Sequence, residues 1–180
     1  MLLSIKEMEV RKIAFAETWK PNEFDFADSG VIQQGPLTAK GLAELLPNTG
    51  GEVRVQGRVQ ASLETECDRC LGRASFPIDA PFDLFYRPVT EAAEEGEEEA
   101  IDEGEAEMGF YELPGLELED IIREQLLLQL PMQRVCSAEC KGICPTCGAN
   151  RNEGACKCEA RQVETKPGDD RWMALKDLHI

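Results

Sequence analysis

Residues 53–65 read VRVQGRVQASLET, and residues 76–86 read FPIDAPFDLFY. In the first run the apolar and small residues stand at odd positions, and in the second they stand at even positions. An alternation with a period of two buries one face of an extended strand and leaves the other in solvent. The two runs therefore predict a long β-hairpin, from about Glu52 to Arg87, and a fold built on an antiparallel sheet.

The short connection between these strands carries Cys67-Asp68-Arg69-Cys70. Because a hairpin connection lies at its tip, we expect both cysteines there. Two cysteines separated by two residues bind one metal ion if the chain turns sharply between them. The alternative is a pair of small, half-buried thiols that only pack.

Six more cysteines fall within twenty-three residues near the C-terminus: Cys136, Cys140, Cys144, Cys147, Cys156 and Cys158. The run Cys144-Pro-Thr-Cys147-Gly has the form of a zinc knuckle, because the glycine permits the backbone conformation that completes the turn. Four soft thiolates suit tetrahedral zinc and leave no open coordination position. We therefore expect a structural zinc rather than a catalytic one.

The eight cysteines divide in more than one way. One division has two four-thiolate sites: Cys144, Cys147, Cys156 and Cys158 in the first, and Cys67, Cys70, Cys136 and Cys140 in the second. This division fastens the hairpin to the C-terminal segment. The other division has a single site: Cys140, Cys144, Cys147 and Cys156.

A disulfide framework is the main competing interpretation of so many cysteines. The N-terminal residues lack the pattern of a secretory signal, so we expect a cytoplasmic protein with reduced thiols. A redox pair of the thioredoxin kind needs a strand-to-helix junction, whereas Cys144 and Cys147 lie in a Gly/Pro-rich stretch. A redox sensor that uses exposed thiolates remains a third functional hypothesis.

We expect five parts along the chain. They are a β-rich domain with the long hairpin (residues 1–90), an acidic disordered loop (91–109), the core helix of the same domain (110–131), a cysteine-rich metal module (132–162) and a C-terminal helix (163–180). The core helix is expected at about Leu116 to Leu130, because proline stands just before and just after it. Further elements follow from local pattern: a strand at Arg11 to Trp19, a short helix around Thr38 to Leu46 and a terminal helix from Asp170 to Leu178.

The charge of the chain is strongly asymmetric. The formal net charge is −16, and the segment from Glu91 to Glu107 holds ten acidic residues and no basic one. Low apolar content and self-repulsion predict disorder there. Such a run is either a solvated linker or a mimic of phosphate that competes for a basic site on a partner.

Basic residues gather instead around the cysteines. Candidates for RNA contact are Lys141, Arg151 and Lys157 in the metal module, with Arg69 and Arg73 near the hairpin tip. Ordinary solvated surface charge is the alternative explanation for these five. No apolar run approaches the span of a bilayer, and there is no nucleophile elbow, phosphate-binding loop or acid–base pair, so we expect neither a membrane protein nor an enzyme.

Several motifs, in their order along the chain, resemble the bacterial YceD family from about residue 50 to the C-terminus. They are Cys67-Asp68-Arg69-Cys70-Leu71, EQLLLQLPM at 124–132, CKGICPTCGAN at 140–150, Cys156-x-Cys158 and DRWMAL at 170–175. The resemblance implies a small cytosolic protein linked to accumulation of large-subunit ribosomal RNA, in bacteria and in plant plastids. It also implies a gene that commonly neighbours one for a large-subunit ribosomal protein.

The sequence thus predicts an α+β fold: an antiparallel sheet curling toward a barrel, packed helices and a small C-terminal zinc module. The leading functional hypothesis is a non-enzymatic factor in large-subunit assembly that binds ribosomal RNA or a ribosomal protein in the pre-ribosome, with no small-molecule substrate. The alternative is an adaptor or chaperone whose acidic loop holds a basic ribosomal protein, without direct RNA contact.

Overall fold

The computed structural model describes residues 1–89, 108–154, 156 and 158. Residues 91–107 of the expected acidic loop lie outside the described residues, as does the expected terminal helix. Elements follow the chain in this order: β1 (Leu2–Ser4), α1 (Ile5–Met8), β2 (Ile13–Trp19), the 3-10 turn η1 (Ala27–Ser29), β3 (Ile32–Gln33), β4 (Leu37–Leu45), β5 (Val53–Glu66), β6 (Arg73–Pro88), β7 (Met108–Tyr111), β8 (Gly115–Glu117) and α2 (Leu118–Leu128).

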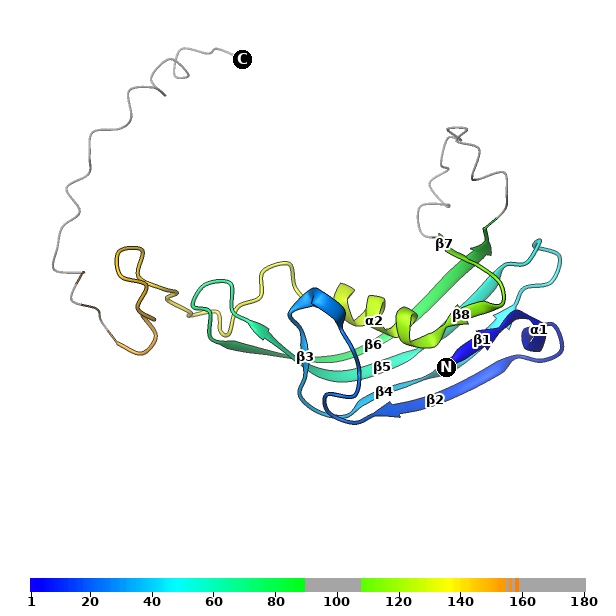
Figure 1. Cartoon of the computed structure of the whole chain (residues 1–180), viewed down its shortest axis with the longest axis horizontal. Helices are drawn as coiled ribbons and strands as arrows, with labels where there is room; N and C mark the ends of the chain where they lie inside the picture. Colours follow the sequence, from blue (N-terminus) through cyan, green and yellow to red (C-terminus); the bar gives the residue numbers. More distant parts are fainter. Residues whose placement is uncertain (90–107, 155, 157, 159–180) are drawn as a thin grey trace, which may run out of the picture.

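The main sheet has the strand order β2-β4-β5-β6-β7, and the short β3 also pairs with β5. All of these pairs are antiparallel except β6–β7, which is parallel, so the sheet is mixed rather than purely antiparallel. Within the described ranges it curves but stays open, with β2 and β7 at its edges, and does not form a barrel (Figure 1). Strands β1 and β8 form a separate antiparallel pair.

The long hairpin predicted from the alternating runs is confirmed. Strands β5 and β6 pair continuously from Val53↔Tyr86 to Glu66↔Arg73. The odd residues Val53, Val55 and Leu63 are fully buried. The hairpin extends beyond β4, its far end pairs with the short β3, and its tip is joined by the segment that follows α2 (Figure 1).

The helix expected at Thr38 to Leu46 is wrong, because this segment is strand β4. It pairs with β2 on one side and β5 on the other. Its buried residues Leu37, Ala39 and Ala43 alternate with more exposed ones, as in a strand. Pairing on both sides outweighs the helix preference of a run rich in Ala, Leu, Lys and Glu.

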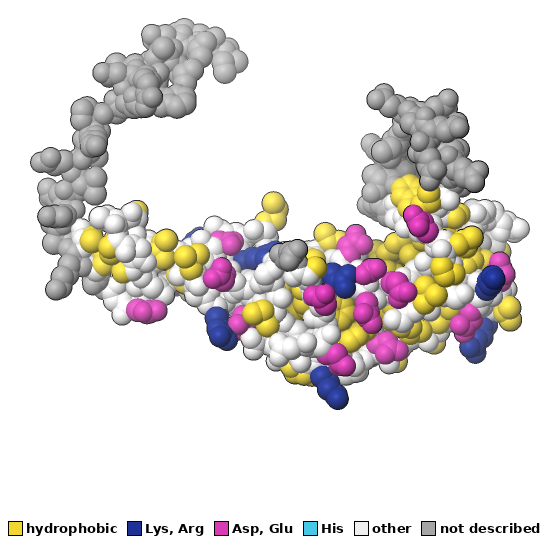
Figure 2. Space-filling model, viewed as in Figure 1, with side chains coloured by type: hydrophobic (Ala, Val, Ile, Leu, Met, Phe, Trp, Pro, Cys, Tyr) yellow, Lys and Arg dark blue, Asp and Glu magenta, His cyan; other side chains and the backbone are white. Residues whose placement is uncertain are grey.

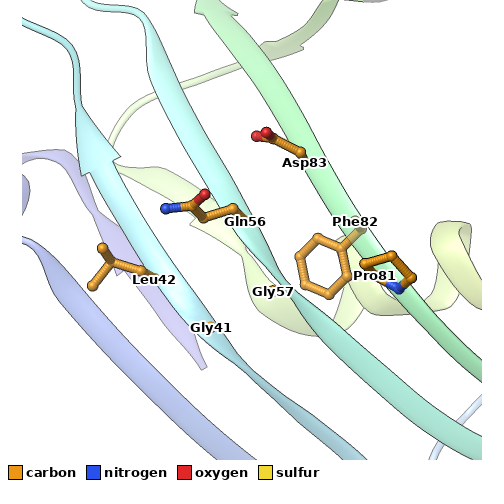
Figure 3. A pocket seen from close by; sticks show the side chains of 7 residues that line it. All are labelled: Gly41, Leu42, Gln56, Gly57, Pro81, Phe82 and Asp83. Atoms are coloured by element: carbon orange, nitrogen blue, oxygen red, sulfur yellow. The ribbon is translucent and has the colours of Figure 1, made fainter.

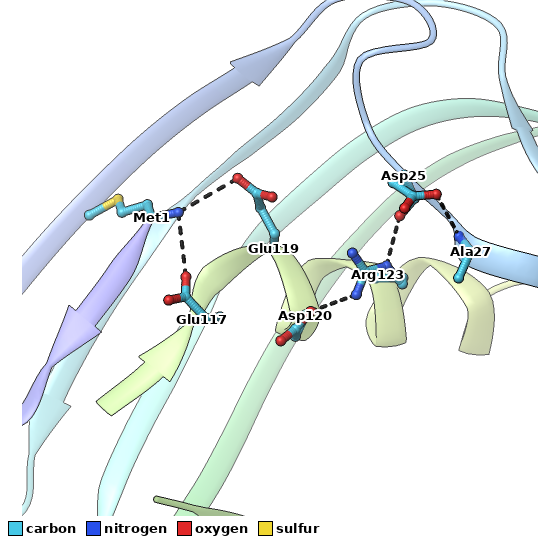
Figure 4. A network of polar contacts seen from close by, with 7 residues as sticks. All are labelled: Met1, Asp25, Ala27, Glu117, Glu119, Asp120 and Arg123. Atoms are coloured by element: carbon cyan, nitrogen blue, oxygen red, sulfur yellow. Dashed lines mark hydrogen bonds and ion pairs between the residues drawn. The ribbon is translucent and has the colours of Figure 1, made fainter. Parts of the chain in front are cut away.

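One face of the sheet is covered by α1, α2, the β1–β8 pair and the loop before β3 (Figure 1). Helix α2 buries Leu118, Ile121, Ile122 and Leu126, at the spacing expected for an amphipathic helix. Arg123 of α2 donates a hydrogen bond of 2.7 Å to the backbone oxygen of Asp25 in that loop, and also pairs with Asp120 (Figure 4). Helix α2 therefore packs on the sheet through its apolar face and is hydrogen-bonded to the loop through Arg123.

A row of four residues in register crosses the sheet in the order Phe15, Gly41, Gly57, Phe82. The rings of Phe15 and Phe82 reach over the two glycines and stack with centroids 6.5 Å apart and planes 11° from parallel. A Cβ on Gly57 would lie 2.8 Å from the Phe82 ring and 2.5 Å from the Lys40 oxygen. Only glycine fits beneath these rings.

Candidate metal centre

The hairpin tip is bound directly to the segment that follows α2. The backbone N–H of Asp68 donates to the oxygen of Arg134 at 2.8 Å, and the Asp68 carboxylate accepts from the N–H of Arg134 at 2.6 Å. The N–H of Ile143 donates to the oxygen of Arg69 at 2.9 Å. Residues far apart in the sequence are thereby brought to one place.

Four cysteines meet at this junction, and we name them the hairpin cluster: Cys67, Cys70, Cys136 and Cys140. Their sulfur atoms all lie within 4.8 Å of one another. Cys67 and Cys140 are 3.8 Å apart, and Cys70 and Cys136 are 3.7 Å apart. A tetrahedron with metal–sulfur bonds of about 2.3 Å has sulfur–sulfur edges of about 3.8 Å, whereas a disulfide is about 2.05 Å long. The spacing fits a metal cage of free thiols.

The other four described cysteines form a second group, the tail cluster: Cys144, Cys147, Cys156 and Cys158. Their sulfur atoms also lie within 4.8 Å of one another. The N–H of Gly148 donates to the oxygen of Cys144 at 2.8 Å, and Gly148 has φ = +73°. This closes the knuckle turn that the sequence suggested. The structure does not bring Cys140 into this group, so the single-site division does not describe the arrangement.

The two clusters differ in exposure. In the hairpin cluster only Cys136 is exposed, and the other three thiols are buried. In the tail cluster only Cys144 is buried, whereas Cys147 is exposed and the remaining two are half-buried. The hairpin cluster is therefore the better shielded of the two.

Backbone N–H groups favour the thiolate form of Cys67 in the hairpin cluster and of Cys144 in the tail cluster. Burial alone would raise the pKa of Cys67, but the N–H groups of Cys136, Cys70 and Arg69 outweigh it and lower the pKa to about 6. The N–H groups of Cys147 and Thr146 likewise lower the pKa of Cys144 to about 6. These donors suit thiolate sulfur, the form that binds metal.

Neighbouring sulfurs have the opposite effect on Cys136 in the hairpin cluster and on Cys158 in the tail cluster. Cys140 and Cys70 raise the pKa of Cys136 to about 12, and Cys147 with burial raises the pKa of Cys158 to about 12. Four thiolates within one cluster repel one another unless a cation lies between them. Each cluster is therefore a set of donors that could hold a metal ion.

Asn152 stands between Cys147 and Cys156 in the sequence but contacts the hairpin cluster, and the sequence alone did not single it out. Its Nδ2 donates to the sulfur of Cys140 at 3.4 Å, and its Oδ1 accepts from the N–H of Lys141 at 2.8 Å. Gly142 lies against the tip with φ = +70°, and a Cβ there would lie 2.9 Å from the oxygen of Arg69. Only the short spacing of Asn152 from the cysteines could have drawn attention to it.

The candidate RNA-contact residues lie in different environments. Arg69 donates to the oxygen of Cys140 at 3.4 Å, and Arg73 pairs with Glu64 at 3.2 Å. Arg151 is half-buried and engaged, whereas Lys141 is exposed and makes no ion pair with a described residue. Lys157 lies outside the described residues.

Two arginines on the open face of the sheet are paired with carboxylates. Arg54 makes a bidentate pair with Asp83, at 2.8 and 2.6 Å, and Arg58 pairs with Asp79 at 2.5 Å. Hydrogen bonds from these arginines lower the pKa of both carboxyl groups. Cations so engaged are poorly placed to bind phosphate.

A shallow pocket lies over the middle of the sheet, lined by Gly41, Leu42, Gln56, Gly57, Pro81, Phe82 and Asp83 (Figure 3). Asp83 is its one ionisable lining residue, and that carboxylate is paired with Arg54. The pocket thus offers neither a nucleophile nor an acid–base pair. In the part of the chain that the structure describes, no helix is long and apolar enough to cross a membrane.

Comparison with known proteins places this chain among factors named for ribosomal RNA. Residues 55–179 match the family described as "Large ribosomal RNA subunit accumulation protein YceD". A maize protein named "Large ribosomal RNA subunit accumulation protein YCED homolog 1, chloroplastic" is 32% identical over 136 residues, covering 63% of this chain and 46% of the maize protein. The Arabidopsis thaliana protein of the same name is 27% identical over 127 residues, covering 59% and 40% of the two chains.

A bacterial relative aligns over more of the chain. An uncharacterized protein of Mycobacterium bovis is 33% identical over 154 residues, covering 82% of this chain and 64% of the relative. The chain thus spans between about two fifths and two thirds of the lengths of these relatives. No solved structure matches it.

Proposed function

The chain belongs to the YceD family, and on this basis we propose that it is a non-enzymatic factor that supports accumulation of large-subunit ribosomal RNA during assembly of the subunit. Two structural zinc ions, one in each cysteine cluster, hold the end of the molecule that meets the partner. The partner is ribosomal RNA or a ribosomal protein of the pre-ribosome. The protein acts in the cytoplasm.

The observation that carries this proposal is the position of the two clusters. The hairpin cluster lies at the tip of the β5–β6 hairpin, and the tail cluster belongs to the segment that is bonded to this tip through Ile143. A metal that binds only the folded arrangement adds its binding energy to the stability of that arrangement. The tip is a place where a small protein core supplies few apolar contacts, so zinc there is a means of holding a contact surface rigid.

Zinc is the metal best suited to these donors. Each cluster offers four sulfur atoms and no carboxylate or imidazole ligand. Thiolates select soft or borderline metals, and a closed tetrahedral four-sulfur shell is typical of structural zinc. The zinc ions would bind no substrate, in keeping with a protein that has no catalytic residues in its pocket.

Direct RNA contact, if made, depends on few cations. Lys141 and Arg69 are exposed and make no ion pair with a described residue, and Arg151, Lys157 and Arg73 are the other candidates. Affinity for RNA rises with the number of phosphates neutralised. The combined replacement of Lys141, Arg69 and Arg73 by glutamine tests whether RNA binding needs them.

An adaptor for a basic ribosomal protein is the second candidate function. Acidic side chains gather on the exposed side of α2 and the residues before it, including Glu117, Glu119, Asp120 and Glu124 (Figure 2). With the net charge of −16, this surface complements a basic protein better than a phosphate backbone. Deletion of residues 91–107 would weaken binding to such a partner and leave RNA contact by Lys141 intact.

The function itself is tested by deleting the gene and measuring large-subunit relative to small-subunit ribosomal RNA. We expect the large-subunit RNA to fall, and the wild-type protein to restore it. A double variant with Cys67→Ser and Cys144→Ser should fail to restore it. Unchanged RNA levels in the deletion strain would contradict the proposed function.

A further inference from the structure

Leu71 has an unfavourable backbone conformation at the tip of the hairpin. Its φ is +60°, in the left-handed region that residues other than glycine adopt rarely. Its side chain is nonetheless 60% exposed. The conformation therefore gains no burial in return, and the fold alone gives no reason for a leucine here.

The tail cluster shows what stability would favour at this position. Leu71 directly follows the second cysteine of its Cys-x-x-Cys turn, and Gly148 does the same in the other turn. Both residues have positive φ, +60° and +73°, and in each turn the N–H of this residue donates to the oxygen of the first cysteine, at 2.9 and 2.8 Å. Glycine meets that requirement without strain. A strained residue that the surroundings hold in place is a reason to look for a function.

Other aliphatic side chains are exposed in the segments bound to this tip. Ile143 is 39% exposed, and its N–H donates to the oxygen of Arg69. Met132 is fully exposed and lies two residues before Arg134, which is bonded to Asp68. The hairpin tip and the two segments bonded to it thus carry three exposed apolar side chains, those of Leu71, Ile143 and Met132.

The chemistry of this surface fits a protein better than RNA. Single-stranded RNA is recognised chiefly by bases stacking on aromatic side chains, and residues 64–73 and 132–154 contain no aromatic residue. Between residues 66 and 73 two acidic residues, Glu66 and Asp68, balance two basic ones, Arg69 and Arg73. Aliphatic side chains on a near-neutral surface match an apolar pocket of a protein.

We propose that Leu71 is the apolar contact by which the hairpin tip docks into a pocket on a basic protein. The basic character of the partner follows from charge complementarity to a chain of net charge −16, with acidic residues exposed along α2. This inference rests on the proposed function, because the partner is a component of the assembling large subunit. It names the partner class and the residue that meets it.

Two variants separate this role from a structural one. Leu71→Gly removes the side chain and relieves the backbone, and Leu71→Asn keeps a similar size in a residue that tolerates positive φ. We expect both to retain the wild-type zinc content and an unchanged or higher denaturation midpoint, yet to fail to restore large-subunit RNA in the deletion strain. The matched control is Leu128→Asn, because Leu128 is 67% exposed on α2 with ordinary helical geometry; it should restore RNA fully.

The partner class is tested by placing the photo-crosslinker p-benzoylphenylalanine at position 71 in the full chain in cells, with position 128 as control. We expect an RNase-resistant adduct at position 71 with an identified basic protein of the large subunit, absent at position 128. In purified form, Leu71→Gly should bind that protein about ten- to a hundredfold more weakly, the loss expected for one buried leucine.

Several outcomes would overturn the inference. They are an RNase-sensitive adduct, which points to RNA; an adduct of twice the chain mass, which points to self-association; no adduct; or loss of zinc and stability in both variants, which assigns Leu71 a structural role. Full RNA restoration by both variants would overturn it as well. If the wild-type protein itself fails to restore RNA, the proposed function fails instead, and the crosslink still decides what meets Leu71.

Discussion

The sulfur atoms of Cys67 and Cys140 lie 3.8 Å apart, although 73 positions separate the two residues in the sequence. Cys67 directly follows β5 at the tip of the β5–β6 hairpin, and Cys140 belongs to the segment after α2. This distance equals the edge of a zinc–thiolate tetrahedron, so one metal ion in the hairpin cluster would join the sheet to the tail.

Single cysteine variants of the two clusters should unfold C-terminal segments of different length. Cys144→Ser removes a ligand of the tail cluster only, so we expect it to retain about one zinc per chain and to expose residues after Cys144 to protease. Cys67→Ser removes a ligand of the hairpin cluster and should expose the chain from about Met132 onward. Elemental analysis with limited proteolysis measures both. A Cys144→Ser protein with full metal content and a protected tail would contradict the assignment.

Asn152 should tune the hairpin cluster although it is not a metal ligand. Its amide N–H stabilises the Cys140 thiolate and is the largest cause that lowers the pKa of that thiol. Loss of such an outer-shell partner weakens metal affinity by about ten- to a hundredfold. We expect Asn152→Ala to lose zinc from the hairpin cluster to a competing chelator at correspondingly lower chelator concentration. The exposed Gln129→Ala is the control, and equal retention in both variants would count against this role.

Packing beneath the Phe15–Phe82 stack predicts a large effect of one methyl group. Gly57→Ala places a Cβ 2.8 Å from the Phe82 ring, and the overpacking should lower the free energy of unfolding by about 2 kcal/mol. Gly35→Ala is the matched control, because no atom lies within 4 Å of its added Cβ; its unfolding free energy should be unchanged or slightly higher. Urea denaturation compares them, and equal midpoints would show that the rings move aside.

The two tyrosines should ionise late. Burial, with a smaller effect of Glu124, raises the pKa of Tyr86 to about 12, and burial also raises the pKa of Tyr111. Because its folded-state pKa is raised, burial of neutral Tyr86 contributes stability that is complete below about pH 10, the pKa of tyrosine in the unfolded chain. This contribution is lost as the pH rises toward about 12. We expect Tyr86→Phe to flatten the alkaline fall in stability. Tyrosinate absorbance of the folded Tyr111→Phe protein gives the value for Tyr86 directly, and ordinary titration near pH 10 would refute its burial.

Periodic pattern predicted the elements that depend on one buried face. The β5–β6 hairpin and helix α2 carry that pattern over many residues, and both formed within a few residues of the expected bounds. The helix prediction for segment 37–45 was wrong because pairing with β2 and β5 overrides its helix-favouring composition. Strands β1, β7 and β8 are three or four residues long and have no readable period. Their pairing, such as Leu3↔Leu116, depends on the whole fold.

The cysteine spacing indicated the chemistry of the candidate site but left the grouping of the ligands open. Spacing alone cannot say whether Cys140 joins Cys67 or Cys144, because it stands four residues before Cys144 and becomes a neighbour of Cys67 only when α2 docks. Asn152 and Leu71 were hidden for a similar reason. A lone amide and a lone leucine acquire meaning from a hydrogen bond to sulfur and from a backbone angle, and neither is visible in composition or period.

The most direct test of the account is the zinc content per chain, measured by elemental analysis of protein purified without chelator or added metal. Two closed four-thiolate clusters predict two zinc ions per chain, and the sulfur geometry predicts that each is bound by sulfur alone. A value of one would mean that one cluster, either the hairpin cluster or the tail cluster, binds no metal. Fully reduced protein with no zinc would contradict the central claim.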